Sequence, residues 1–416
     1  MKRYLTTFVA VAMLVGLGLT IGCQRAVEPG IDLGPPPPEV PPEDLAALVE
    51  GNNQFALDLY KKLAETEKGN IFFSPYSISS ALAMTYAGAR GQTAEEMAKV
   101  LGITKLGDKV HPAHASLAYK LKSAGGKDKP EFQIANALWG QTGLSFKPEF
   151  LQLTRKHYGA GLQEVNFSDT ENARGTINKW VGDQTREKIP ELLKPGVLDG
   201  DTKLVLTNAI YFKADWLHPF EKTSTKAGPF HRTPTDTVTV PFMHQEACFR
   251  VAGIGDARVL ELPYVGGEYA MLIVLPHKPE DFDSIHLSLT NESISGWLAK
   301  STEHKYDIML PKFKMQMAVN LVPTLQQLGM TTAFVENAAD FSNCEESKHL
   351  FIESVEHQAT IDVDESGTTA AAATEVSAKT KSLGPQFIVD RPFLVIIRSK
   401  QTGAIVFIGK VLDPKL

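Results

Sequence analysis

Polar side chains on otherwise apolar strand faces are the residues of this chain best placed for chemistry. In the predicted strand at residues 203–213, Asn208 shares a face with Leu, Ile and Phe. In the predicted strand at residues 354–365, His357 shares a face with Val, Ala and Ile, and Glu365 ends that face. A buried polar group needs a hydrogen-bond partner, and a buried carboxylate needs a cation or water. Each residue alone favours a structural role over catalysis, and together they predict a hydrogen-bond network that can latch a sheet.

No motif of a known catalytic or metal-binding type accompanies these residues. The 416 residues contain no G-x-S-x-G, H-E-x-x-H, Walker loop or C-x-x-C pattern. His111 and His114 lie in HPAH, where the proline and the short spacing argue against a metal site. Three cysteines are too few for a disulfide framework. The sequence therefore predicts no catalytic residue, no metal ion and no cofactor.

The segment DESGTTAAAATEVSAKTKS at residues 364–382 alternates between two kinds of side chain. Every second residue from Thr368 to Thr380 is small and uncharged, whereas Glu375 and the two lysines fall in the other phase. A two-residue period is typical of a half-buried strand, yet alanine and lysine are poor strand formers. Two interpretations stay open, namely an exposed loop that can become a strand, or a flexible low-complexity linker.

Helices are expected early in the chain and strands late. Ser74, followed by Pro75, is typical of a helix N-terminus, and Thr93 with Glu96 fits a capping box that would open the next helix. From residue 203 onward, alternating and continuous apolar runs predict strands. Because strands and helices do not alternate regularly, the pattern predicts an α+β fold.

Length and charge limit the number of domains and the kinds of partner. The chain has 43% hydrophobic residues and no internal repeat or second linker, which favours one large domain at residues 43–416. The formal net charge is −6, and Lys and Arg are spread along the chain. A nucleic-acid partner is therefore not predicted.

The first residues resemble an export signal. Lys2 and Arg3 precede an apolar run at residues 8–21, which is too short and wrongly flanked for a membrane-spanning helix. We therefore expect residues 1–23 to be a signal peptide.

The end of this signal suggests an anchor. Gly22-Cys23 resembles a bacterial lipobox, in which Cys23 would be lipidated and would hold the protein at a membrane, although Thr20 stands where Leu is usual. Secretion with cleavage nearby is the alternative. Residues 24–42 contain GPPPPEVPP, which predicts an extended linker. The expected location is extracytoplasmic, as a secreted protein or a cell-envelope lipoprotein.

From about Glu43 to the C-terminus the chain resembles the serpin family. Several stretches carry the resemblance, and together they cover essentially the whole folded part: NIFFSPYSISSALAMTYAGARGQTAEEM (70–97), TKLVLTNAIYFKADWLHPF (202–220), LPKFKMQMAVNLVPTLQQLGMTTAF (310–334), IDVDESGTTAAAATEV (361–376), and FIVDRPFLVIIR (387–398) with GAIVFIGKVLDP.

The resemblance implies a fold and a mechanism. It implies three β-sheets with a large central sheet, about eight to nine helices and an exposed reactive-centre loop. It also implies a suicide-substrate inhibitor of serine proteases rather than a protease. The protease cleaves the loop and forms an acyl-enzyme, and the cleaved loop then inserts into the central sheet and carries the distorted enzyme with it.

The resemblance also assigns site residues. Counting the family's usual interval from Gly367 puts the reactive bond at Lys381-Ser382, with cleavage after Lys379 or Thr380 as the runner-up. A hinge is implied at Glu365, Gly367, Thr368, Thr369, Ala370, Ala371, Ala372 and Ala373. A sheet-opening cluster is implied at Ser74, Ser77, Asn208 and His357, and an ion pair of Glu365 with Lys312 is implied close to Trp216.

A lysine before the reactive bond suits an extracellular trypsin-like protease, which would be trapped in a covalent complex by a monomeric inhibitor. Two alternatives are a serpin-fold binding protein without inhibition and an inhibitor of cysteine proteases. Small, uncharged hinge residues favour inhibition over the first alternative.

Overall fold

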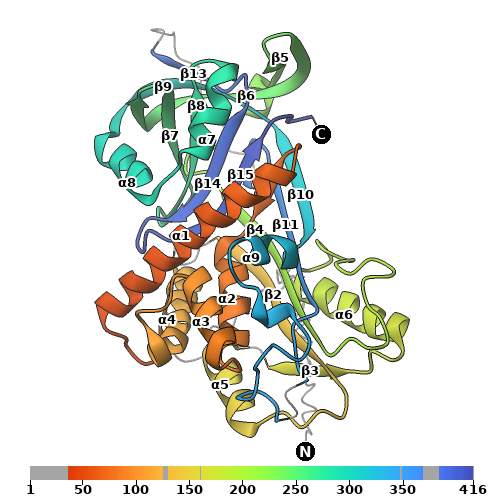
Figure 1. The fold of residues 1–416 in the computed structure, drawn as a ribbon. Coiled ribbons are helices and arrows are strands. Elements are labelled where there is room, and N and C mark those ends of the chain that lie inside the picture. The colour runs from red at the N-terminus through yellow and green to blue at the C-terminus, as the bar shows by residue number, and fades with distance from the viewer. Residues whose placement is uncertain (1–35, 125–129, 160, 347–348, 369–383, 416) are drawn as a thin grey trace, which may run out of the picture. The chain divides into compact units, whose positions relative to one another are not determined.

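The computed structural model describes residues 36–124, 130–159, 161–346, 349–368 and 384–415. The described residues form nine α-helices and two hydrogen-bonded sheets (Figure 1), which confirms the α+β class. None of these helices is both long enough and apolar enough to cross a membrane. The helices are α1 (Pro42–Thr66), α2 (Pro75–Tyr86), α3 (Gly91–Val100), α4 (Val110–Ser123), α5 (Pro148–Tyr158), α6 (Thr170–Gln184), α7 (Phe282–Leu287), α8 (Asn291–Lys300) and α9 (Val322–Gln327).

Local sequence explains where α2 begins but corrects the predicted start of α3. Ser74 caps α2 by accepting the backbone N–H of Ser77 at 3.2 Å. The capping box at Thr93 and Glu96 is wrong, because α3 begins at Gly91 and both residues lie inside it. Their side chains instead accept backbone N–H groups of the 331–340 segment, so they join α3 to a distant part of the chain.

The first sheet has six strands in the order β10–β11–β12–β4–β2–β3. Its central feature is a parallel pairing of β11 with β4, from Ser354 opposite Val205 to Thr360 opposite Tyr211. At one end the two-residue β12 lies between them, antiparallel to both. The strands are β2 (Glu131–Gln141), β3 (Leu162–Val165), β4 (Leu204–Asp215), β10 (Phe313–Asn320), β11 (Ser354–Val363) and β12 (Gly367–Thr368).

The second sheet joins two parts through one long strand. The first part of β6 pairs with β5 and β9, whereas its last residues pair with β7, so two smaller sheets merge into nine strands. With the six-stranded sheet these parts give the three sheets that were expected. The strands are β1 (Ile71–Phe73), β5 (Lys226–Thr233), β6 (Asp236–Ile254), β7 (Ala257–Pro263), β8 (Tyr269–Pro276), β9 (Thr302–Pro311), β13 (Gln386–Ile388), β14 (Phe393–Ser399) and β15 (Ile405–Val411).

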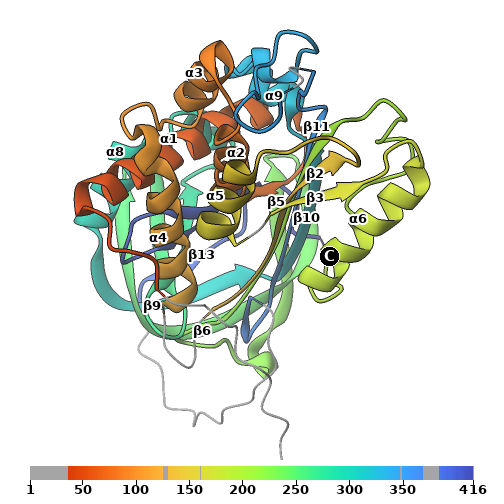
Figure 2. The same ribbon diagram turned by 90° about the horizontal axis from the view of Figure 1, so that it is seen from below.

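Both faces of the six-stranded sheet are covered. Figure 2 shows α2 on one side of this sheet and α6 on the other. Alternate residues of β4 pack into two separate hydrophobic cores, one on each face of the sheet. Leu206 and Ile210 belong to the main core, whereas Val205 and Ala209 pack with Ile177 of α6. A strand added to this sheet would therefore have to fit between two packed layers.

Candidate functional site

The two polar residues predicted on apolar strand faces lie opposite each other in the sheet. Asn208 of β4 and His357 of β11 are register partners, and His357 Nδ1 hydrogen-bonds to Asn208 Oδ1. The backbone N–H of Ser74 donates to His357 Nε2 at 3.3 Å. Because Nε2 accepts, the ring proton lies on Nδ1, which is therefore the donor to Asn208. This bond joins β4 and β11 side chain to side chain beneath the start of α2.

The cluster has a further member that the sequence analysis missed. Asn208 Nδ2 donates to Ser77 Oγ at 2.7 Å and to Asn136 Oδ1 at 2.5 Å. Asn136 lies on β2 opposite Asn208, and its own Nδ2 donates to the carbonyl of Ser77 at 3.2 Å. The signal that identified Asn208 was available here too, because Asn136 lies on the same face of its strand as the apolar Phe132 and Leu138. We call Ser74, Ser77, Asn136, Asn208 and His357 the sheet cluster.

The surroundings of the sheet cluster fit a latch and not a catalytic centre. Asn208 and His357 have no exposed surface, so neither can meet a substrate while the sheet is closed. Burial lowers the pKa of His357 to about 3, which keeps the imidazole neutral at physiological pH. Ser74 Oγ also donates to the carbonyl of Val406 at 2.7 Å, which ties α2 to β15 of the second sheet. The cluster can hold two strands and a helix together until they are forced apart.

A second polar site lies at the end of the sheet where β11 and β4 part. Glu365 is two residues beyond the end of β11, which is shorter than the predicted strand. Its carboxylate accepts from Lys312 Nζ at 2.8 Å and from Thr225 Oγ1 at 2.7 Å. Burial raises the pKa of Glu365, but these hydrogen bonds outweigh burial and leave the pKa lowered. The carboxylate therefore stays charged and paired.

Trp216 packs against the turn that precedes the hinge. Its indole Nε1 donates to the carbonyl of Asp364 at 3.1 Å, and its backbone N–H donates to the carbonyl of Ser366 at 3.0 Å. Its ring stacks on Tyr264 with centroids 4.6 Å apart. The hydroxyl of Tyr264, a residue that the sequence analysis did not select, lies 3.0 Å from Thr368 Oγ1.

Two of the predicted hinge residues, Gly367 and Thr368, lie within the sheet. Thr368 pairs with Val363 of β11 and with Ala214 of β4, and it has no exposed surface. Gly367 is tightly enclosed, since a Cβ there would lie 2.2 Å from the carbonyl oxygen of Ala214. The remaining predicted hinge and reactive-bond residues lie outside the described residues: Thr369, Ala370, Ala371, Ala372, Ala373, Lys381 and Ser382.

Comparison with known proteins assigns the chain to a protein family. The family described as Serpin (serine protease inhibitor) matches residues 50–414. The chain belongs to the serpin family. The prediction of a protease inhibitor rather than an enzyme is confirmed at the level of the family and of its named relatives.

Named relatives and solved structures agree with this assignment. Serpin B8 of Bos taurus is 40% identical over 376 residues, covering 88% of this chain and 100% of the relative. Leukocyte elastase inhibitor of Homo sapiens is 40% identical over 379 residues, covering 88% and 99%. The structure of uncleaved ovalbumin has a TM-score of 0.83 at 31% identity, covering 88% of this serpin and 100% of that chain. Human thyroxine-binding globulin with its bound hormone has a TM-score of 0.82 at 32% identity, covering 90% and 100%.

The location expected from the first 42 residues is wrong. The relationship to serpin B8 and leukocyte elastase inhibitor points away from a secreted or cell-envelope lipoprotein. An apolar run behind two basic residues is a feature that export signals share with other short apolar segments, so the pattern alone does not determine a location. Cys23, on which the expected anchor depended, lies outside the described residues of this serpin.

Proposed function

We propose that this serpin inhibits trypsin-like serine proteases by inserting its cleaved reactive-centre loop between β11 and β4. One observation carries the proposal: Thr368 pairs with both strands, Gly367 pairs with β4, and the two residues begin an antiparallel strand between β11 and β4. Continuing that strand requires the seven direct residue pairs between β11 and β4 to separate.

The register of β12 predicts which loop residues meet the sheet cluster. Thr368 pairs with Ala214 and Val363, and each step along an antiparallel strand moves one residue back along both neighbours. Six steps later Thr374 would lie between Asn208 and His357. Insertion would therefore break the hydrogen bond between these two side chains and place a hydroxyl where it had been. Every second residue from Thr368 to Ala378 is small and uncharged, which suits the core-facing side.

The target follows from the residue before the reactive bond. We assign this bond to Lys381-Ser382, and a lysine side chain fits a protease whose specificity pocket carries an aspartate. Fourteen inserted residues span about 46 Å, so the protease attached to the loop would be carried far from where it bound. Lys312, Glu365 and Trp216 would control the first step, because they hold the turn from which insertion starts.

A gel with trypsin tests this proposal. Inhibition by insertion predicts an SDS-stable complex of summed mass, together with a released peptide that begins at Ser382. Cleavage at the same bond without a complex would contradict inhibition of this protease. Lys381→Glu should abolish the complex with trypsin, while Lys194→Glu, which changes an exposed lysine between α6 and β4, should leave complex formation intact.

A binding protein without inhibition is the second candidate. Its support is the fold shared with thyroxine-binding globulin, whose structure holds a bound hormone. The gel separates the two, because a binding protein of this fold would be cut by trypsin and would form no complex. Papain in place of trypsin tests the remaining alternative, a cysteine protease as the target.

A further inference from the structure

A cavity of about 380 Å³ borders the sheet cluster and has no part in the proposed inhibition. Its walls come from α2, α4, α5, α6, β2 and β3, and Asn136 of the cluster lines it. Figure 2 shows α4 and α5 side by side on the α2 side of the sheet. Ligand sites in proteins are typically concave spaces of this size, with aromatic walls and a few polar groups.

Lys122 of α4 is a cation at this cavity that has no counter-charge among the described residues. Lys122 of α4 lines the cavity and makes no hydrogen bond or ion pair with any other described residue. The described residues that line the cavity include no aspartate or glutamate. Burial lowers the pKa of Lys122, and burial also lowers the pKa of His157, a second lining residue. An unpaired ammonium that has lost part of its water is stabilised by an anion.

Aromatic rings bound the same space. Tyr76 of α2, Tyr158 of α5 and Trp180 of α6 all line the cavity. A flat ring can pack against such side chains, while a carboxylate at one end reaches the ammonium. We infer that this cavity binds a small aromatic carboxylate, with its negative group paired to Lys122 and its ring held among Tyr76, Tyr158 and Trp180.

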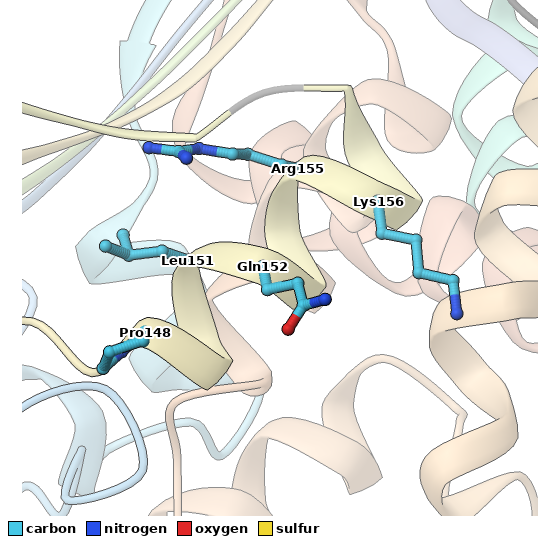
Figure 3. Close-up of a pocket in the computed structure, with 5 residues that line it drawn as sticks. All are labelled: Pro148, Leu151, Gln152, Arg155 and Lys156. Carbon is cyan, nitrogen blue, oxygen red and sulfur yellow. The ribbon is translucent and has the colours of Figure 1, made fainter.

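A more open hollow on α5 offers a contrast. Figure 3 shows that its five labelled residues all come from this one helix and that the side chains of Arg155 and Lys156 point away from each other. Two cations that do not converge cannot hold one carboxylate. We therefore infer a carboxylate site at the cavity beside Lys122 and not at the α5 hollow.

The position of the cavity couples a ligand to the state of the sheet. An inserted strand would move β4, β2 and β3 away from β11 by about 4.8 Å. Ser74 binds Val406 of β15 and His357 of β11, whereas Ser77 binds Asn136 of β2, so moving β2 away from β11 would disturb one of these sets of contacts at the edge of the cavity. A ligand that fits the closed sheet would then oppose insertion. This consequence, unlike the binding itself, rests on the proposed function.

Calorimetry with 2-naphthoate on the intact protein tests the binding. We expect saturable binding at one site, no binding of the neutral isostere 2-naphthamide, and a loss of affinity of about tenfold or more in Lys122→Met, as for a lost ion pair. Lys120→Met is the matched control, because Lys120 lies on the same helix but does not line this cavity. Equal binding of the amide, unchanged affinity in Lys122→Met, or no binding of naphthoate would each overturn the inference.

The gel with trypsin then tests the coupling separately. A concentration of 2-naphthoate that just saturates wild-type protein should slow complex formation by wild type and by Lys120→Met, and it should slow Lys122→Met much less. If wild-type protein binds naphthoate and forms complexes at an unchanged rate, the cavity is a binding site that is not coupled to the sheet. If no variant forms a complex, the proposed inhibition fails while the calorimetric result stands.

Discussion

At the scale of single residues, the hinge depends on side-chain size and polarity. Gly367 has room for no Cβ, and the hydroxyl of Thr368 meets that of Tyr264 in a position without solvent contact. Residues of the opposite phase point to the other face of the sheet. The first of them, Thr369, would have Lys213 and Asp362 as neighbours in the extended register, and both are only partly buried. Adjacent positions of the hinge should therefore differ sharply in what they tolerate.

Thr368→Arg should convert the inhibitor into a substrate, because an unpaired charge would have to enter the buried position at the start of the inserted strand. The measurement is the fraction of molecules that trypsin cleaves without forming a complex. Thr369→Arg is the matched control, since it adds the same charge one residue later on the other face. Efficient complexes with Thr368→Arg would contradict strand insertion, and equal failure of both variants would contradict the assignment of faces.

At the scale of elements, the sheet cluster is the polar contact that the proposed insertion would break. It links β2, β4, β11 and the start of α2 through hydrogen bonds in which at least one partner is a side chain. A hydrogen bond contributes little net free energy when made, but a buried partner left without one is costly. The cluster therefore stabilises the closed sheet mainly through the penalty for disturbing it.

Asn136→Leu should destabilise the protein by about 1–3 kcal/mol, because it leaves Asn208 Nδ2 and Ser77 Oγ without their shared acceptor. Urea unfolding measures the loss. Gln133→Leu lies on the same strand, and among the described residues the Gln133 side chain hydrogen-bonds to the nearby Glu131 alone, so this change should alter the free energy of unfolding much less. Similar losses in the two variants would contradict a special role for the cluster.

The elements also mark what the sequence could and could not predict. The alternation of side chains along β4 and β11 identified Asn208 and His357, because a polar residue on an apolar strand face can be recognised without knowing its partner. Tyr264 lacked such a signal, since only the fold brings it to Thr368. Thr93 and Glu96 had the right spacing for a cap, yet their partners lie more than 200 residues away. In each case in which the local sequence pattern gave no prediction or a wrong one, the residue's partner is distant in sequence and is brought near by the fold.

At the scale of the whole molecule, buried neutral histidines should make stability depend on pH. Burial lowers the pKa of His114 and of His357 to about 3, whereas an unfolded histidine titrates near about 6.5. As pH falls below that value, only the unfolded chain gains protons at these sites, so the free energy of unfolding falls. Between pH 7 and 5, each such histidine accounts for a loss of about 2 kcal/mol.

Urea unfolding of His114→Gln at the two pH values isolates one of these contributions. The variant should lose about 2 kcal/mol less than wild type on going from pH 7 to 5, since glutamine does not titrate. His304→Gln, which replaces an exposed histidine on β9, is the control and should follow wild type. An unchanged pH dependence in His114→Gln would mean that His114 takes up a proton in the folded state.

Cleavage at the reactive bond should stabilise the whole molecule. A loop that inserts exchanges the seven direct pairs of β11 with β4 for backbone hydrogen bonds on both sides of a new central strand. With roughly 10 added hydrogen bonds of about 1 kcal/mol each, the gain should raise Tm by about 10 °C or more.

This rise in Tm is a test that needs no complex. Wild-type protein cut by a protease that it does not trap should unfold at a higher temperature than intact protein, because release of the loop removes the restraint on insertion. Thr368→Arg cut at the same bond should show no rise, since its first buried position rejects the charge. A cut wild type that melts with the intact protein would identify a serpin fold that does not insert its loop, and it would favour the binding protein over the inhibitor.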